Sequence, residues 1–172
     1  PQGTLFGRNT TGGAINLITR QPGSEFANDQ KLGYASDNEF TSRTVVDTGE
    51  IGDTGIRALF AYSHNQMDGW VRNTLTASDD GYGSTNSNSF YADIRADITD
   101  DFSAEYRLDY SDMHAQPAAY QLTVVSPADQ SYFGASPAFG GAPLVVSPNF
   151  RSTLQSYDAD PPEQDHIYGH SL

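Results

Sequence analysis

The sequence contains no cysteine, which excludes disulfide frameworks, thiolate catalysis and cysteine-based zinc sites. Basic residues are also few, since nine Lys and Arg stand against 22 Asp and Glu and give a formal net charge of −13. Proteins that bind nucleic acid neutralise its phosphates with clustered Lys and Arg, so this balance argues against a nucleic-acid partner. No stretch approaches the ~20 apolar residues of a membrane-spanning helix. Because the chain begins at Pro1 rather than at a methionine, we expect it to be a segment of a longer protein.

Aromatic residues are plentiful, with ten Tyr and nine Phe, and many of them fall in an alternating pattern. In residues 90–98, and again in residues 102–110, apolar and polar side chains alternate along the chain. A period of two predicts strands with one apolar and one polar face, whereas a helix would mix both kinds on every face. The short connection at residues 99–101 predicts a hairpin between the two strands.

The register of this hairpin follows from the length of its turn. With a three-residue turn, Ile98 faces Phe102, and apolar residues lie opposite apolar residues along both strands. The polar face then holds two opposite-charge cross-strand pairs. These pairs are Arg95 with Glu105, and Asp93 with Arg107.

Further strands are predicted at about residues 26–36, 40–49 and 56–67, and another begins near residue 165. The connections near 68–88 and 115–164 are long and polar, whereas the others are short. A meander with long loops at one end and short turns at the other is typical of outer-membrane barrels, whose apolar face contacts lipid and whose polar face lines the lumen. A soluble β-sandwich, as an enzyme or a binding module, is an alternative, but loops this long are rare in compact domains.

The opening stretch PQGTLFGRNTTGG carries four glycines around one arginine and leads into the strand-like AINLIT. A phosphate-binding loop does not fit, because the glycine spacing is one residue short and no lysine follows the second glycine. The stretch closely resembles the end of the plug domain in TonB-dependent outer-membrane receptors. The later DGWVRN and the hairpin at residues 90–110 resemble the early barrel of the same family.

This resemblance implies a fold and a division into domains. The fold class is all-β, a partial antiparallel transmembrane β-barrel meander preceded by the last strand of a plug domain. Residues 1–23 would be the C-terminal end of the plug, and residues 24–172 the N-terminal part of the barrel, with about five to six strands. In the family, ~22 strands close around the plug. The positions that match the closing motif of the plug are Gly3, Gly7, Arg8, Asn9, Gly12 and Gly13.

The resemblance also implies a function. Receptors of this family take up scarce substrates across the outer membrane of Gram-negative bacteria, and the inner-membrane protein TonB supplies the energy. We therefore expect an integral outer-membrane receptor whose partners are lipid, TonB and a small molecule such as a ferric siderophore. We expect neither enzyme activity nor a cofactor. The alternative is a passive porin-like or structural barrel, against which the plug-like motif argues.

Several side chains are candidates for these roles. Arg8 could pair with lumen carboxylates and lock the plug, or it could cap nearby loop carbonyls as a structural residue. The four charged residues of the hairpin are expected to form solvated ion pairs in the lumen. Four residues of the long loops could meet a ligand, or could instead anchor and pack the loops. They are Trp70, Arg72, Tyr82 and Tyr120.

No metal site is predicted. His166 and His170 stand four apart, which in a strand separates them by ~13 Å, too far for one metal ion. His64 and His114 are isolated near strand ends. Residues 78–86 (SDDGYGSTN) lack the spacing and the closing glutamate of an EF-hand, so we expect a solvated loop there.

Overall fold

A computed structural model of the chain describes residues 19–74, 81–99, 101–116, 120–134, 144–148, 153–155 and 163–172. The plug-like positions from Gly3 to Gly13, including Arg8, lie outside the described residues. The expected last plug strand, residues 14–19, lies outside them as well, except for Thr19. The described fold is therefore that of the expected barrel segment and of the few residues that lead into it.

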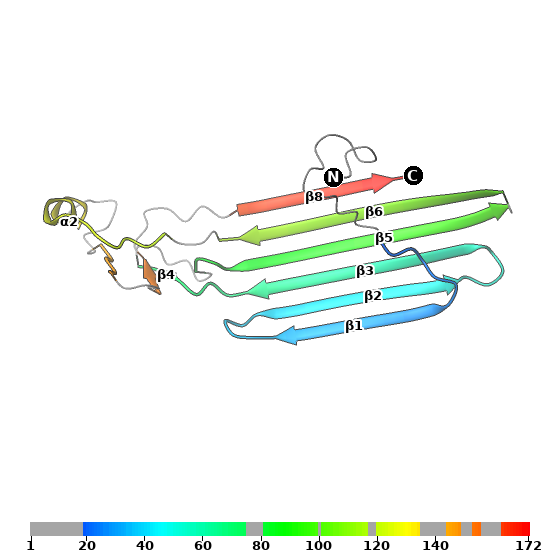
Figure 1. Cartoon of the computed structure of the whole chain (residues 1–172), viewed down its shortest axis with the longest axis horizontal. Coiled ribbons are helices and arrows are strands. Elements are labelled where there is room, and N and C mark those ends of the chain that lie inside the picture. Colours follow the sequence, from blue (N-terminus) through cyan, green and yellow to red (C-terminus); the bar gives the residue numbers. More distant parts are fainter. Residues whose placement is uncertain are drawn as a thin grey trace, which may run out of the picture.

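Six strands form one antiparallel sheet in the order β1-β2-β3-β5-β6-β8 (Figure 1). Their bounds are Phe26–Tyr34 for β1, Phe40–Glu50 for β2, Ile56–Met67 for β3, Thr85–Thr99 for β5, Phe102–Ala115 for β6 and Glu163–Ser171 for β8. Each of these strands pairs with the next one along the chain, once the two-residue strands β4 and β7 are set aside. The described part of the chain is therefore an all-β antiparallel meander, as the alternating pattern predicted.

Three short elements lie in the long connections and were not predicted. β4 (Arg72–Asn73) and β7 (Leu154–Gln155) pair in parallel and so join the two long connections to each other. The helix α2 (Pro127–Gly134) interrupts the second connection. Within the described residues, no helix has the length and apolar character needed to cross a membrane.

The turn between β1 and β2 follows from two residues with positive φ. Asp37 and Asn38 have φ angles of 58° and 52°. Two consecutive left-handed residues define a type I′ turn, whose twist matches that of antiparallel strands, and Asp and Asn tolerate this conformation. The amide of Glu39 donates to the carbonyl of Ser36 at 3.2 Å and closes the turn. The short connection predicted here is confirmed.

The hairpin of β5 and β6 has the predicted register over most of its length. Ile94 lies opposite Tyr106, and Asp97 lies opposite Ser103. The prediction is wrong at the tip, where Thr99 rather than Ile98 pairs with Phe102. The register shifts between Asp97 and Thr99, so Ile98 is the extra residue of a bulge and the turn is shorter than expected.

The two faces of the sheet differ in an unusual way. Large apolar side chains that alternate along neighbouring strands are exposed on one face, and this apolar face carries Phe60, Tyr62, Phe90, Ile94, Tyr106 and Tyr110. The opposite, polar face buries charged groups, because Asp47 is 1% exposed and Asp93 is 0% exposed. Water-soluble domains bury apolar side chains and expose charges, so this sheet has the reverse arrangement.

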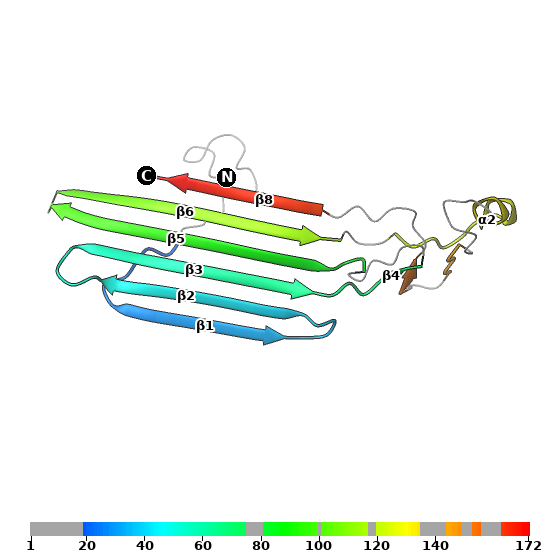
Figure 2. The same ribbon diagram turned by 180° about the vertical axis from the view of Figure 1, so that it is seen from behind.

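A crossing segment, residues 19–25, leads into β1. Figures 1 and 2 show this dark blue segment running across one face of the sheet to the start of β1. Its contacts with Asp47 on β2 and with Tyr91 on β5 place it on the polar face. The polar face is therefore the one that residues 19–25 cross.

Candidate functional site on the polar face of the sheet

A row of side chains on the polar face lies beneath the crossing segment. Cross-strand pairing places Asp47, Leu59, Asp93 and Arg107 opposite one another on β2, β3, β5 and β6. Asp47, Leu59 and Asp93 are all buried. Two of these three buried residues are aspartates. Because burying a carboxylate is costly, each of them needs hydrogen bonds or ion pairs to replace the water that it has lost.

Asp47 holds the crossing segment against β2. The backbone amide of Gly23 donates to Asp47 Oδ2 at 2.8 Å, and Arg20 donates to the same oxygen at 3.4 Å. The amide of Gly49 donates to Asp47 Oδ1 at 3.1 Å. Both carboxylate oxygens are therefore satisfied, mainly by backbone amides, because the Arg20 side chain is 62% exposed and screened by solvent.

Gly49 allows the backbone of β2 to lie in close contact with the backbone at the end of the crossing segment. Gly49 has a φ of +63°, and a Cβ there would lie 2.6 Å from the carbonyl carbon of Glu25 and the nitrogen of Phe26. The amide of Glu50 donates to the carbonyl of Ser24 at 3.1 Å. The pairing of β2 with β3 shifts its register here. The bulge at Gly49 therefore lets the chain pass from the crossing segment into β1 in direct contact with β2.

Asp93 is the centre of a second group of contacts. Arg107 Nε donates to Asp93 Oδ2 at 3.2 Å, which is one of the two predicted ion-pair contacts, and the Tyr91 hydroxyl donates to the same oxygen at 3.2 Å. Tyr91 also has a side-chain hydrogen bond with Thr19 of the crossing segment. Asp93 Oδ1 is buried, and no group among the described residues donates a hydrogen bond to it. Tyr91 thus links the crossing segment to Asp93 and, through it, to Arg107 on β6.

The other predicted pair, Arg95 with Glu105, is not among the ion pairs of the described residues, although the two residues lie opposite each other. Arg95 Nε instead donates to Asp97 Oδ1 at 3.1 Å, and Arg107 donates to Glu105 Oε1 at 2.7 Å. Arg57 on β3 lies opposite Arg95 and also pairs with Asp97. Asp97 therefore offsets two guanidinium groups that face each other, which a hairpin considered alone could not reveal.

Three of the loop candidates lie in one connection. Val71 and Tyr82 form a β-bridge, and Asn73 Nδ2 donates to the Tyr82 hydroxyl at 3.3 Å. Tyr82 is 5% exposed, so in this structure it packs the loop instead of facing a ligand. Trp70 and Arg72 are exposed on either side of the bridge.

The fourth loop candidate, Tyr120, lies in the other long connection and is 81% exposed. The two connections meet at β4 and β7, where the amide of Arg72 donates to the carbonyl of Thr153 at 2.9 Å. The contact joins segments about eighty residues apart in the sequence, and strands of two residues are too short to carry a periodic signal that could predict it.

The pairing of β6 with β8 brings together histidines that looked isolated in the sequence. His166 Nδ1 lies 2.9 Å from Asp112 Oδ1, and His114 Nδ1 lies 3.7 Å from the same oxygen. The rings of His114 and His166 meet edge to face, with centroids 6.3 Å apart. Within the described residues, no group of three His, Asp or Glu side chains is placed to hold a metal ion. The cluster therefore acts as a cross-strand contact between β6 and β8.

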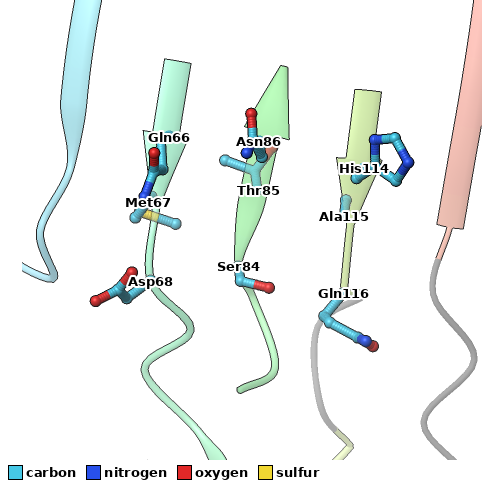
Figure 3. Close-up of a pocket in the computed structure, with 9 residues that line it drawn as sticks. All are labelled: Gln66, Met67, Asp68, Ser84, Thr85, Asn86, His114, Ala115 and Gln116. Carbon is cyan, nitrogen blue, oxygen red and sulfur yellow. The ribbon is translucent and has the colours of Figure 1, made fainter. Parts of the chain in front are cut away.

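Figure 3 shows the residues of a pocket that lies where β3 and β6 end and β5 begins. Its volume is about 420 Å³. Most of the residues that line it are polar, and they are Gln66, Met67, Asp68, Ser84, Thr85, Asn86, His114, Ala115 and Gln116. None of the sequence-predicted site residues lines it. A second pocket of about 260 Å³ lies between Arg43, Tyr91 and Asp109, next to the Thr19 contact. Both pockets are formed by residues from several strands, which the sequence alone could not group.

Comparison with known proteins gives two kinds of relative. The chain is 26% identical over 106 residues to the vitamin B12 transporter BtuB of Vibrio vulnificus. The aligned region makes up 62% of this chain and 17% of that protein. It is 34% identical over 80 residues to the pesticin receptors of Yersinia pestis and Yersinia enterocolitica. This aligned region makes up 46% of this chain and 12% of those proteins. The chain thus spans less than a fifth of the length of these relatives. No family model matches it, and no solved structure matches it significantly.

These relatives are a transporter and receptors. They confirm, at low identity and over part of the chain, the resemblance to TonB-dependent outer-membrane receptors that the opening motif indicated. The exposed aromatic face and the opposite polar face agree with the strands of outer-membrane barrels, which are apolar outward and polar inward.

Proposed function

We propose that the chain is a segment of a TonB-dependent receptor that imports a scarce small molecule across the outer membrane. In this proposal residues 1–23 end the plug, and residues 24–172 form the N-terminal part of the barrel. The observation that carries it is the inverted sheet, with an exposed aromatic face on one side and the crossing segment over buried carboxylates on the other.

The dimensions of the apolar face support a position in the membrane. On β5 the apolar positions run from Phe90 to Ile98, a stretch that spans ~26 Å along a strand. This length is close to the apolar band of about 25 Å in outer-membrane barrels. Beyond it the same face becomes polar, with Asn88 and Asp112 in successive strands. The lipid of the outer membrane would therefore contact the aromatic face, with head groups near these polar residues.

The polar face supports a lumen filled by a plug. The ion pairs made by Asp93, Arg95, Glu105 and Arg107 would line the lumen, and Trp70, Arg72 and Tyr120 would face the cell exterior. A passive porin-like channel needs an open lumen, whereas here the crossing segment lies on the polar face. The plugged receptor is therefore the better supported of the two, and TonB is its partner in this proposal.

The finer part of the proposal concerns the substrate. The relatives are named for vitamin B12 and for pesticin. We propose a metal chelate of the ferric-siderophore kind as the substrate, with the exposed aromatic residue Trp70 and the cationic Arg72 of the first long connection offering stacking and charge to it.

Uptake in cells that produce the full-length protein tests the function. Radioactive ferric siderophores and cyanocobalamin would be supplied to wild-type cells, to cells lacking the receptor and to cells lacking TonB. We expect uptake of one ferric siderophore to be lost in both deletions. Uptake that needs the receptor but persists without TonB would instead establish the passive channel, and loss of cobalamin uptake alone would replace the proposed substrate.

The location has its own test. The tryptic peptide ADITDDFSAEYR, residues 96–107, would be sought by mass spectrometry in membrane and soluble fractions. We expect it in a large, heat-modifiable outer-membrane band. A soluble band near 18.6 kDa would contradict the proposal.

A further inference from the structure

The contacts that attach the crossing segment to the sheet differ between its start and its end. At its start, Thr19 is held by the Tyr91 hydroxyl, and the exposed Arg20 reaches Asp47 at 3.4 Å. At its end, the Gly23 amide donates to buried Asp47 at 2.8 Å. Backbone contacts then continue into β1 through Ser24. The contacts of Thr19 and Arg20 are therefore made by exposed side chains. The contacts from Gly23 onward are made by backbone groups, and the carboxylate that binds Gly23 is buried.

We propose that Asp47 is a positioning residue that fixes the end of the plug to the barrel wall, so that plug and wall separate only upstream of Gly23. The proposal rests on the proposed function, because it assumes that the crossing segment joins a plug to a barrel. Import requires the plug to move or loosen while the barrel stays closed, and a fixed exit point confines that movement.

The local geometry suits a permanent contact. Asp47 is buried and receives amide donors on both oxygens, from Gly23 and from Gly49. Charge-assisted hydrogen bonds in a buried position are stronger than solvated ones. A Cβ at Gly23 would lie 3.2 Å from Asp47 Oδ2, so glycine lets the segment approach the carboxylate without crowding it. The neighbouring Pro22 is buried and has no amide hydrogen, so the hold on the backbone at this point comes from the amide of Gly23.

Hydrogen exchange on the full-length receptor in detergent tests this without any substrate. Exchange would be read at single amides in water and in increasing urea. We expect the Gly23 and Gly49 amides, which donate to Asp47, to keep their protection up to the urea concentration at which the paired amides of β2 and β3 lose theirs. If the Gly23 amide loses protection at a lower urea concentration than these strands in the wild-type receptor, there is no fixed point at Asp47 and the proposal is overturned.

Variants of the carboxylate make the test specific. Asp47→Ala should speed exchange at Gly23 and Gly49 by about tenfold, the effect of losing one hydrogen bond. Asp47→Asn keeps one acceptor oxygen and should restore part of the protection, which also covers the case in which the alanine variant fails to fold. Asp29→Ala, which removes an exposed aspartate on β1, is the matched control and should change neither amide.

The outcomes separate this inference from the proposed function. Unchanged exchange at Gly23 in Asp47→Asn and Asp47→Ala would overturn the role of Asp47, even in a receptor shown to import a siderophore. Faster exchange in both variants would support the anchor even if the uptake experiments pointed to a passive channel.

Discussion

At the scale of single residues, the two buried carboxylates differ in how completely they are satisfied. Asp47 receives a donor on each oxygen, whereas Asp93 Oδ1 has no hydrogen-bond partner in the part of the chain that the structure describes. Burial of a carboxylate is costly unless donors replace its water. Asp47 meets that requirement by contact with the backbone, and this contact depends on Gly49, which lets β2 bend at the point where the crossing segment ends.

Substitution of Gly49 should therefore be among the more harmful changes in the sheet. Gly49→Ala adds a Cβ that would lie 2.6 Å from backbone atoms of Glu25 and Phe26, in a residue with φ of +63°. We expect a loss of about 3 kcal/mol in the free energy of unfolding, measured by urea denaturation of the purified receptor. Gly52→Ala is the control, since Gly52 has a similar φ and no atom within 4 Å of its Cβ position. It should cost only about 1 kcal/mol, and equal losses would contradict the steric argument.

At the scale of elements, the strands could be predicted because each has a period of two over many residues. The register could be predicted as well, except at Ile98, where a bulge replaces the longer turn. What could not be predicted were contacts between segments far apart in the chain. The pair of His114 and His166, and the pair of β4 and β7, depend on which strands become neighbours. The predicted pair of Arg95 with Glu105 was wrong for a similar reason. Arg95 instead pairs with Asp97, which also pairs with Arg57 of another strand.

The first long connection should depend on its small buried centre. Val71 is among the most buried side chains of the described residues, and it bridges Tyr82. Val71→Ala should remove about 1–2 kcal/mol of local stability and speed trypsin cleavage after the exposed Arg72 several-fold. Val124→Ala, at an exposed position of the other long connection, is the control and should leave the cleavage rate unchanged. An unchanged rate in both variants would mean that this bridge does not order the connection.

At the scale of the whole molecule, the sheet is arranged for two different surroundings. Its apolar face would be unfavourable in water, where a contiguous aromatic patch of this kind promotes association. Its polar face needs the crossing segment, because Asp47 would otherwise be a partly unsatisfied carboxylate beside apolar Leu59. One surrounding alone, whether water or lipid, would leave one of the two faces unfavourable, and the proposed position in a membrane wall, with polar chain on the inner side, would suit both faces.

Because of this arrangement, a lysine introduced on the apolar face should destabilise the protein much more than a lysine introduced on the polar face. Phe60→Lys places a charge on the apolar face, where lipid contact should cost about 2–4 kcal/mol near the middle of the membrane. Ser63→Lys, three residues along the same strand, places the same charge on the exposed polar face and should cost little. The measurement is the fraction of full-length receptor that runs as a heat-modifiable folded band in outer-membrane fractions. We expect Phe60→Lys to lower this fraction strongly and Ser63→Lys to leave it near the wild-type value. Equal losses, or a larger loss for Ser63→Lys, would mean that the aromatic face does not contact lipid, and the membrane orientation proposed for the sheet would be wrong.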